Sequence, residues 1–165
     1  MEKSNIVLIG MPASGKSTVG VILAKILGMD FCDTDILIQQ REGLKLNQIL
    51  EKRGVDAFLE CEERALLSLN AENTVIATGG SAIYSKKGMS HLKKTSMIIY
   101  LKVPQKEIFR RISDIKERGV VLFDSQSIDD MYRERSKLYE EYADITVKED
   151  GSSIEETVQA IVGQI

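Results

Sequence analysis

Short apolar runs alternate along the chain with longer segments in which apolar residues recur every three or four positions. The short runs are rich in β-branched residues and almost continuously apolar, which is typical of strands buried on both faces of a sheet. They lie at residues 6–9, 31–32, 74–77, 97–101 and 145–147. Buried strands separated by helical segments predict a parallel sheet with crossover helices, that is, an α/β fold.

The helical segments carry start and stop signals. Residues 16–27 place apolar side chains on one stripe and end at Gly28, a residue that commonly terminates helices. A similar stripe predicts a helix over residues 56–69. Near the end of the chain, Ser152 and Glu155 have the spacing of a capping box, which predicts that they open the last helix.

Composition limits the classes of partner. The 165 residues and 43% apolar content suit one compact domain, which we expect to span residues 1–165. The net charge of −3 and the 5% aromatic content do not favour nucleic acid, and no run reaches the roughly 20 apolar residues that cross a membrane. Two cysteines form no secreted disulfide framework. We therefore expect a cytoplasmic monomer that acts on small molecules.

The stretch GMPASGKST matches the motif G-x-x-x-x-G-K-[ST] through Gly10, Gly15, Lys16 and Ser17. It lies between a predicted strand and a predicted helix, the context in which this motif forms a phosphate-binding P-loop. Lys16 is expected to bridge the β- and γ-phosphates of a nucleotide, and the Ser17 hydroxyl to bind Mg²⁺. Backbone N–H groups converge on the phosphates from Ala13, Ser14, Gly15, Lys16, Ser17 and Thr18.

A P-loop alone does not decide between a switch, a motor and a kinase, and a glycine-rich turn that binds nothing is the alternative to all three. The sequence has no N-K-x-D guanine-recognition motif, and a large motor needs a longer chain. A small kinase remains. Its second substrate is expected beyond the carboxyl ends of the strands, where ligands bind in open α/β sheets.

Two carboxylates follow the second predicted strand, Asp33 and Asp35 in the stretch DTD. If this segment is extended, alternate residues share a face and the two carboxylates point the same way. One carboxylate could then serve Mg²⁺ and the other an acceptor hydroxyl. The alternative is a turn and helix cap before Ile36.

Glycines and arginines complete the candidate site. Gly79 and Gly80 follow the third strand, where they allow a ligand close to the backbone, although a plain tight turn also explains them. Arg118 lies in a loose segment, residues 116–127, that is either a surface loop or a mobile lid. One arginine can stabilise a transferring phosphate and another, such as Arg135, can clamp a carboxylate, although single helix arginines are more often solvated.

Taken in order, GMPASGKST, DTD, TGGSA, the arginine-bearing segment and RSKLYEEYADI resemble the shikimate kinase family from about residue 6 to residue 147. The resemblance implies a P-loop kinase fold like that of nucleoside-monophosphate kinases, a three-layer α/β fold with strand order 2-3-1-4-5. It also implies transfer of the γ-phosphate of ATP, with Mg²⁺, to the 3-hydroxyl of shikimate.

The same resemblance implies roles for individual residues. Lys16, Asp35 and Arg118 would be catalytic, and Asp33 would assist Ser17 with the metal. Arg110, or its neighbour Arg111, would lie against the adenine. The acceptor would be bound by Asp35, Gly79, Gly80, Ser81 and Arg135.

The sequence departs from the family pattern on the acceptor side. The family motif F-R-x-x-E reads FLECE here, with Leu59 in place of the arginine that grips the shikimate carboxylate, and the third glycine of G-G-G is Ser81. Losing one side of a buried clamp costs about 2 to 5 kcal/mol. A substitute cation is needed, and Lys45, Arg53 and Arg64 are nearby in sequence. The departure leaves open another polyol or hydroxy acid as acceptor, or an ATP-binding regulatory domain without catalysis.

Overall fold

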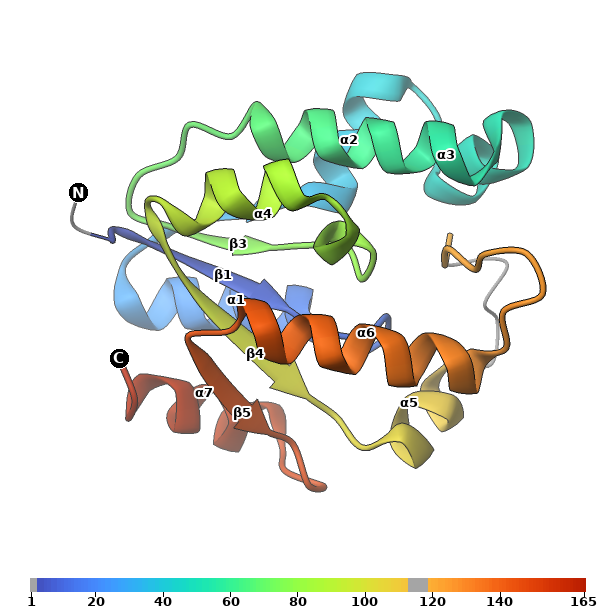
Figure 1. Cartoon of the computed structure of the whole chain (residues 1–165). Coiled ribbons are helices and arrows are strands. Elements are labelled where there is room, and N and C mark those ends of the chain that lie inside the picture. Colours follow the sequence, from blue (N-terminus) through green and yellow to red (C-terminus); the bar gives the residue numbers. More distant parts are fainter. Residues whose placement is uncertain (1–2, 113–118) are drawn as a thin grey trace.

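The computed structural model describes residues 3–112 and 119–165, and Figure 1 shows a central sheet covered by helices. The strands are all parallel and lie in the order β2-β3-β1-β4-β5. This confirms the predicted α/β fold and the strand order that the resemblance implied. The strands are β1 (Asn5–Ile9), β2 (Asp30–Asp33), β3 (Thr74–Ala77), β4 (Ser96–Lys102) and β5 (Ile145–Lys148).

The connections between strands are helical, as predicted. The helices are α1 (Lys16–Leu27), α2 (Thr34–Glu42), α3 (Leu46–Leu67), α4 (Lys86–Lys93), α5 (Gln105–Arg111), α6 (Ile128–Tyr142) and α7 (Ile154–Val162), with a short 3₁₀ turn, η1 (Ala82–Tyr84). No helix among the described residues is both long and apolar enough to cross a membrane.

Alternate residues of β1 show how the sheet divides the core. Ile6 and Leu8 pack on one face with side chains of α1 and α7, whereas Val7 and Ile9 pack on the other face with side chains of α3, α4 and α6. All four side chains are buried. Burial on both faces explains why the strand reads as an unbroken apolar run.

A third apolar cluster joins α2 to α3 and includes Ile38, Ile49 and Phe58. Helix α3 begins ten residues before the predicted position 56, and it bends at Gly54, which has φ 83° and ψ 176°. A positive φ suits glycine, which has no Cβ to clash with the backbone. Residues on both sides of the bend, Ile49 before it and Phe58 after it, pack in this cluster.

The predicted cap of the last helix was wrong by one residue. Ser153, not Ser152, caps α7: its hydroxyl accepts from the Glu156 backbone N–H at 3.2 Å, and the Glu156 carboxylate accepts from the Ser153 N–H at 2.7 Å. This register turns Val158 and Ile161 into the core, where both are fully buried.

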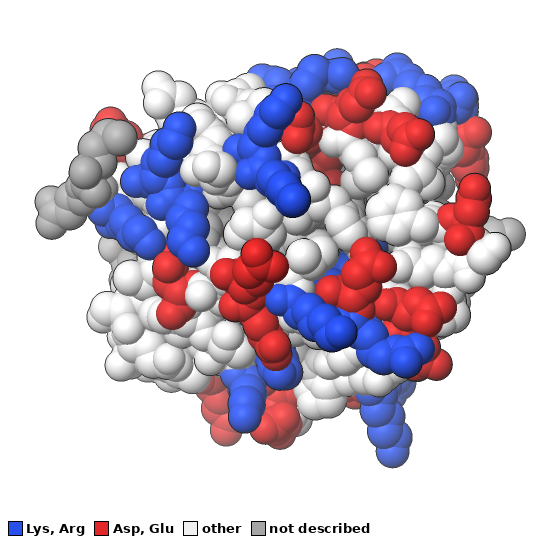
Figure 2. Space-filling view, in the orientation of Figure 1, with Lys and Arg blue, Asp and Glu red and all other residues white. Residues whose placement is uncertain are grey.

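Figure 2 shows that Lys and Arg side chains are interspersed with Asp and Glu side chains on the face seen in Figure 1. This distribution matches the net charge of −3. The functional residues instead gather at one edge of the sheet, because β1, β2 and β3 are parallel and their carboxyl ends meet there.

Candidate active site

The loop between β1 and α1 has the backbone geometry of an anion cradle. Gly15 caps α1 in the left-handed conformation, with φ 85° and ψ 12°, and Ala13 also has a positive φ of 62°. The first amide that bonds within the helix is that of Val19, which donates to the Gly15 carbonyl. The amides of residues 16–18 therefore have no partner inside the helix and stand at its positive end.

Lys16 lies folded against this loop. Its Nζ donates to the carbonyls of Gly10 at 2.9 Å and Met11 at 2.7 Å and to the Ser14 hydroxyl at 3.2 Å. The side chain is buried, and burial lowers the pKa of Lys16 to about 8 although Asp35 opposes the shift. Lys16 is thus a buried cation held by neutral acceptors, which an anion can replace.

Asp33 and Asp35 face different partners. Asp33 ends β2 and caps α2, its Oδ1 accepting from the Asp35 N–H at 2.9 Å and the Ile36 N–H at 3.4 Å. Its Oδ2 accepts from the Ser17 hydroxyl at 2.5 Å. The extended interpretation of DTD was therefore wrong and the helix-cap alternative is confirmed: Thr34 begins the helix, which turns Asp35 away from Asp33 and into the pocket.

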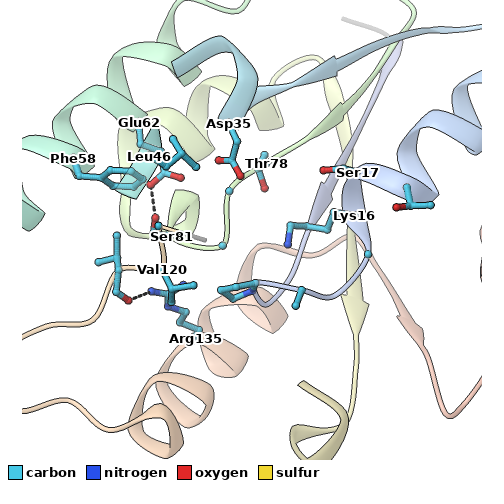
Figure 3. A pocket seen from close by; sticks show the side chains of 18 residues that line it. Lys16, Ser17, Asp35, Leu46, Phe58, Glu62, Thr78, Ser81, Val120 and Arg135 are labelled. Carbon is cyan, nitrogen blue, oxygen red and sulfur yellow. Dashed lines mark hydrogen bonds between the residues drawn. The ribbon is translucent and has the colours of Figure 1, made fainter. Parts of the chain in front are cut away.

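A cavity of about 340 Å³ joins the P-loop to the ends of β2 and β3. Figure 3 shows Asp35 and Glu62 above it, Arg135 below it and Lys16 to its right. It is lined by Pro12, Ala13, Gly15, Lys16, Ser17, Thr18, Asp35, Leu46, Phe58, Glu62, Thr78, Gly79, Gly80, Ser81, Gly119, Val120, Val121 and Arg135. Most residues predicted for the site thus meet in one pocket, although Ser14 and Asp33 are not among its lining residues.

Asp35 is one of two carboxylates in this pocket. Burial raises its pKa to about 6, and the neighbouring Asp33 adds to the shift while Lys16 opposes it. A carboxylate with a raised pKa, beside a P-loop, is placed to accept a proton.

Gly79 and Gly80 are glycines because side chains approach them closely. A Cβ on Gly79 would lie 2.5 Å from Glu62 Oε1 and 2.8 Å from Asp35 Oδ1. A Cβ on Gly80 would lie 2.8 Å from the Pro12 ring and 3.1 Å from Arg135 Nη1. The two residues therefore form the wall along which the acidic and basic groups of the pocket meet.

Glu62 is the functional candidate that the sequence prediction missed. It is 1% exposed, and its Oε2 accepts from the Ser81 hydroxyl at 2.6 Å. Its Oε1 is buried and has no hydrogen-bond partner within the described part of the chain. Burial raises its pKa to about 7. The available signal was the glutamate of the F-R-x-x-E pattern, which Glu62 retains although Leu59 replaces the arginine.

Arg135 is buried without a carboxylate partner. It is 1% exposed, donates from Nη2 to the Val121 carbonyl at 2.6 Å and stacks 5.4 Å from the centre of the Tyr84 ring. Its Nε has no partner, and no carboxylate of residues 3–112 or 119–165 lies within salt-bridge distance of it. The solvated alternative for Arg135 is therefore wrong, and the guanidinium is oriented for an anion.

Arg118 and residues 116–117 of the predicted lid lie outside the described residues. The following residues of that segment reach the pocket: Gly119, Val120 and Val121 line it, and Val121 packs with the apolar cluster of α2 and α3. A Cβ on Gly119 would lie 2.6 Å from the Leu46 Cβ. The described part of the segment thus closes one side of the cavity.

The substitute cations considered from the sequence do not line the pocket. Arg53 and Arg64 pair with Glu42, and Lys45 stands just before α3. Leu59 itself packs into the apolar cluster of α2 and α3. Among the described lining residues, Lys16 and Arg135 carry the positive charges.

The two arginines predicted for the adenine lie outside this pocket, on a separate surface hollow. Arg110 is exposed and pairs with Glu107 at 2.7 Å. Arg111 donates to the Ala13 carbonyl at 3.3 Å and pairs with Glu149 at 2.7 Å, so it contacts the P-loop at Ala13.

The parallel sheet, the P-loop and the adjoining pocket define a P-loop phosphotransferase fold. Comparison with known proteins shows to which family of phosphotransferases the chain belongs. A family model described as shikimate kinase matches residues 12–165. A shikimate kinase from Pasteurella multocida (strain Pm70) is 38% identical over 99% of this chain and 96% of its own length. The chain therefore belongs to the shikimate kinase family, whose members are ATP-dependent phosphotransferases that act on an alcohol.

Solved structures agree with this assignment. A shikimate kinase from Acinetobacter baumannii in complex with shikimate superposes with a TM-score of 0.89 at 31% identity, covering 98% of this chain and 92% of that one. A shikimate kinase from Aquifex aeolicus gives a TM-score of 0.83 at 36% identity, covering 96% and 94%.

Proposed function

We propose that the protein transfers the γ-phosphate of ATP to the 3-hydroxyl of shikimate. The single observation that carries this proposal is the pocket in which a P-loop, a half-buried aspartate and a buried arginine, unpaired among the described residues, meet. Family membership and the Acinetobacter structure with shikimate support the choice of acceptor.

The phosphate side uses Lys16 and the start of α1. Lys16 would leave the carbonyls of Gly10 and Met11 and contact the β- and γ-phosphates, while the amides of residues 13–18 bind phosphate oxygens. We further propose Arg110 or Arg111 against the adenine.

Ser17 and Asp33 fit a magnesium ion that arrives with the nucleotide. The Ser17 hydroxyl and the Asp33 carboxylate lie 2.5 Å apart, and both are the oxygen ligands that Mg²⁺ prefers. When bound, Mg²⁺ would neutralise charge on the β- and γ-phosphates.

The acceptor side uses Asp35 and Arg135. The Asp35 carboxylate would orient the acceptor hydroxyl and accept its proton as phosphate transfer proceeds. Arg135 would bind the acceptor carboxylate through the guanidinium edge that lies beside Gly80. From the sequence pattern, we propose that Arg118 stabilises the transferring phosphate and that residues 116–127 act as a lid that excludes water.

A coupled ADP-release assay with shikimate, gluconate and homoserine tests the acceptor. Saturable turnover is expected with shikimate, and mass spectrometry should detect a singly phosphorylated product. Turnover confined to another polyol or hydroxy acid would replace shikimate as the acceptor. Calorimetry that shows tight ATP binding without turnover on any acceptor would point instead to a regulatory domain, which is the alternative that Leu59 favours.

A further inference from the structure

The Glu62 carboxyl has one satisfied oxygen and one free oxygen. The Ser81 hydroxyl donates to Oε2 at 2.6 Å, so this oxygen already acts as an acceptor. Oε1 is fully buried at the pocket wall and has no partner among the described residues. In the neutral acid the proton therefore belongs on Oε1, which becomes a hydrogen-bond donor at the pocket wall.

The surroundings of Glu62 favour the neutral form. The charged groups that face it are Asp35 from α2, Lys16 from the start of α1 and Arg135 from α6. Within the described ranges no cation lies within salt-bridge distance of the Glu62 carboxylate, and position 59, one helical turn before it, is a leucine. A buried carboxylate without a paired cation is costly, so Glu62 holds its proton to a higher pH than an exposed glutamate does.

Glu62 and Arg135 flank neighbouring points on one wall. Glu62 Oε1 lies beside Gly79 and Arg135 Nη1 beside Gly80, at 2.5 and 3.1 Å from the respective Cβ positions. Figure 3 shows the two side chains reaching this wall from opposite sides, with Ser81 between them. An anionic group of an acceptor that binds against this wall would therefore lie between the two side chains.

We propose that Glu62 is a specificity-determining residue that, as the neutral acid, donates a hydrogen bond from Oε1 to the acceptor carboxylate that Arg135 also binds. This inference rests on the proposed function for its acceptor, a hydroxy acid. The acid takes the place of the missing arginine at position 59, and Ser81 holds it in position. When the free protein has Glu62 ionised, binding the acceptor anion takes up one proton from solvent.

The direction of the pKa shift agrees with this geometry. Burial raises the pKa of Glu62 to about 7, so ionised and neutral forms coexist in the free protein near neutral pH. Acceptor binding should therefore weaken as pH rises above about 7, approaching a tenfold loss per pH unit for one linked proton.

Calorimetric titration of shikimate into the ATP-free protein at pH 8, in buffers of different ionisation enthalpy, measures the proton count. We expect uptake of about one proton per shikimate bound, because most Glu62 is ionised there. Glu62→Gln keeps a donor without a titrating group, so the proton uptake due to Glu62 should be lost and affinity should fall less steeply above pH 7. Any remaining pH dependence would come from the other titrating groups of the pocket, such as Lys16. Glu63→Gln is the matched control, because Glu63 is adjacent and accepts from Ser85 rather than Ser81.

A neutral analogue of shikimate, with a hydroxymethyl group in place of the carboxylate, gives a second measurement that needs no variant. It should bind without proton uptake. Equal uptake with both ligands, or no uptake with shikimate, would overturn the role of Glu62.

The turnover assay separates this inference from the proposed function. If the protein phosphorylates shikimate but binds it without proton uptake, only the role of Glu62 fails. If another hydroxy acid is the acceptor, the same titration with that acid decides the role of Glu62, while shikimate as acceptor fails.

Discussion

The two halves of the pocket are formed by different parts of the protein, mainly by backbone groups on the phosphate side and by single side chains on the acceptor side. On the phosphate side, consecutive residues 10–18 supply backbone amides, a helix start and one lysine. On the acceptor side, single side chains come from α2, α3 and α6 and meet on a wall formed by Gly79 and Gly80. A site made of backbone depends on one local motif, whereas a site made of side chains can change one residue at a time.

This difference between the two halves matches the positions at which the sequence departs from the family pattern. The P-loop motif is intact, and both Leu59 and Ser81 fall on the acceptor side. Ser81 donates to Glu62, one turn after the changed position 59, so the two departures meet at the same carboxyl. Substitutions on each side should therefore affect different kinetic constants.

Lys16→Ala should have the largest effect, because it removes the cation of the phosphate side. We expect kcat to fall by about 1,000-fold or more, as for loss of a preorganised charge at a reacting phosphate. Steady-state kinetics with a coupled ADP assay measure this, with circular dichroism to check folding. Lys25→Ala, exposed on the same helix, is the control and should keep full activity.

Asp35→Asn tests the proton acceptor at the boundary of the two halves. We expect kcat to fall by about 100- to 1,000-fold, because an amide cannot take the acceptor proton. ATP affinity, measured by calorimetry, should change little. Asp30→Asn at the exposed start of β2 is the matched control. An Asp35→Asn enzyme with parental kcat would exclude Asp35 as the base.

Glu62→Gln should change how stability depends on pH. Because the folded-state pKa of Glu62 is raised to about 7 from 4.5, its stabilising contribution is complete below about pH 4.5 and is lost as pH rises through 7. The parent should lose up to about 3 kcal/mol of unfolding free energy relative to Glu62→Gln over this range. Urea unfolding at several pH values measures the difference, and parallel pH curves for the two proteins would contradict it.

Arg135→Lys should have the smallest of these effects, because it keeps a positive charge but loses the guanidinium edge. We expect the KM for the acceptor to rise about 30-fold, near the lower limit for a damaged buried charge pair, with little change in the KM for ATP. Arg133→Lys, on an exposed part of α6, is the control. An equal rise in both KM values would contradict the division into two halves.

Local patterns predicted most of the fold. The β1 run and the P-loop fixed a strand, a turn and the bounds of α1, because burial on both faces and a glycine-rich loop leave few alternatives. Near the end of the chain, two serines each had an acidic residue three positions later, and only core packing of Val158 and Ile161 selects Ser153. The spacing of serine and glutamate is the same at both positions, so spacing alone cannot show which serine caps the helix.

The candidate site was predictable only in part for the same reason. Asp33 and Asp35 were found from their spacing, but their orientation depends on a helix cap that the extended interpretation did not include. Glu62 was missed because its significance comes from the contact with Ser81, 19 positions away in the sequence. The F-R-x-x-E pattern pointed to position 62, but the contact with Ser81 is created by the fold and cannot be seen in local spacing.

The buried Arg135 has a practical consequence for handling the protein. Its Nε has no partner among the described residues and its Nη1 lies beside Gly80 at the pocket wall, so a small anion that enters the pocket can accept from the guanidinium and bind the folded chain in preference to the unfolded chain. The melting temperature should therefore depend on the salt in the storage buffer, with sulfate or a simple carboxylate giving a higher value than chloride at equal ionic strength.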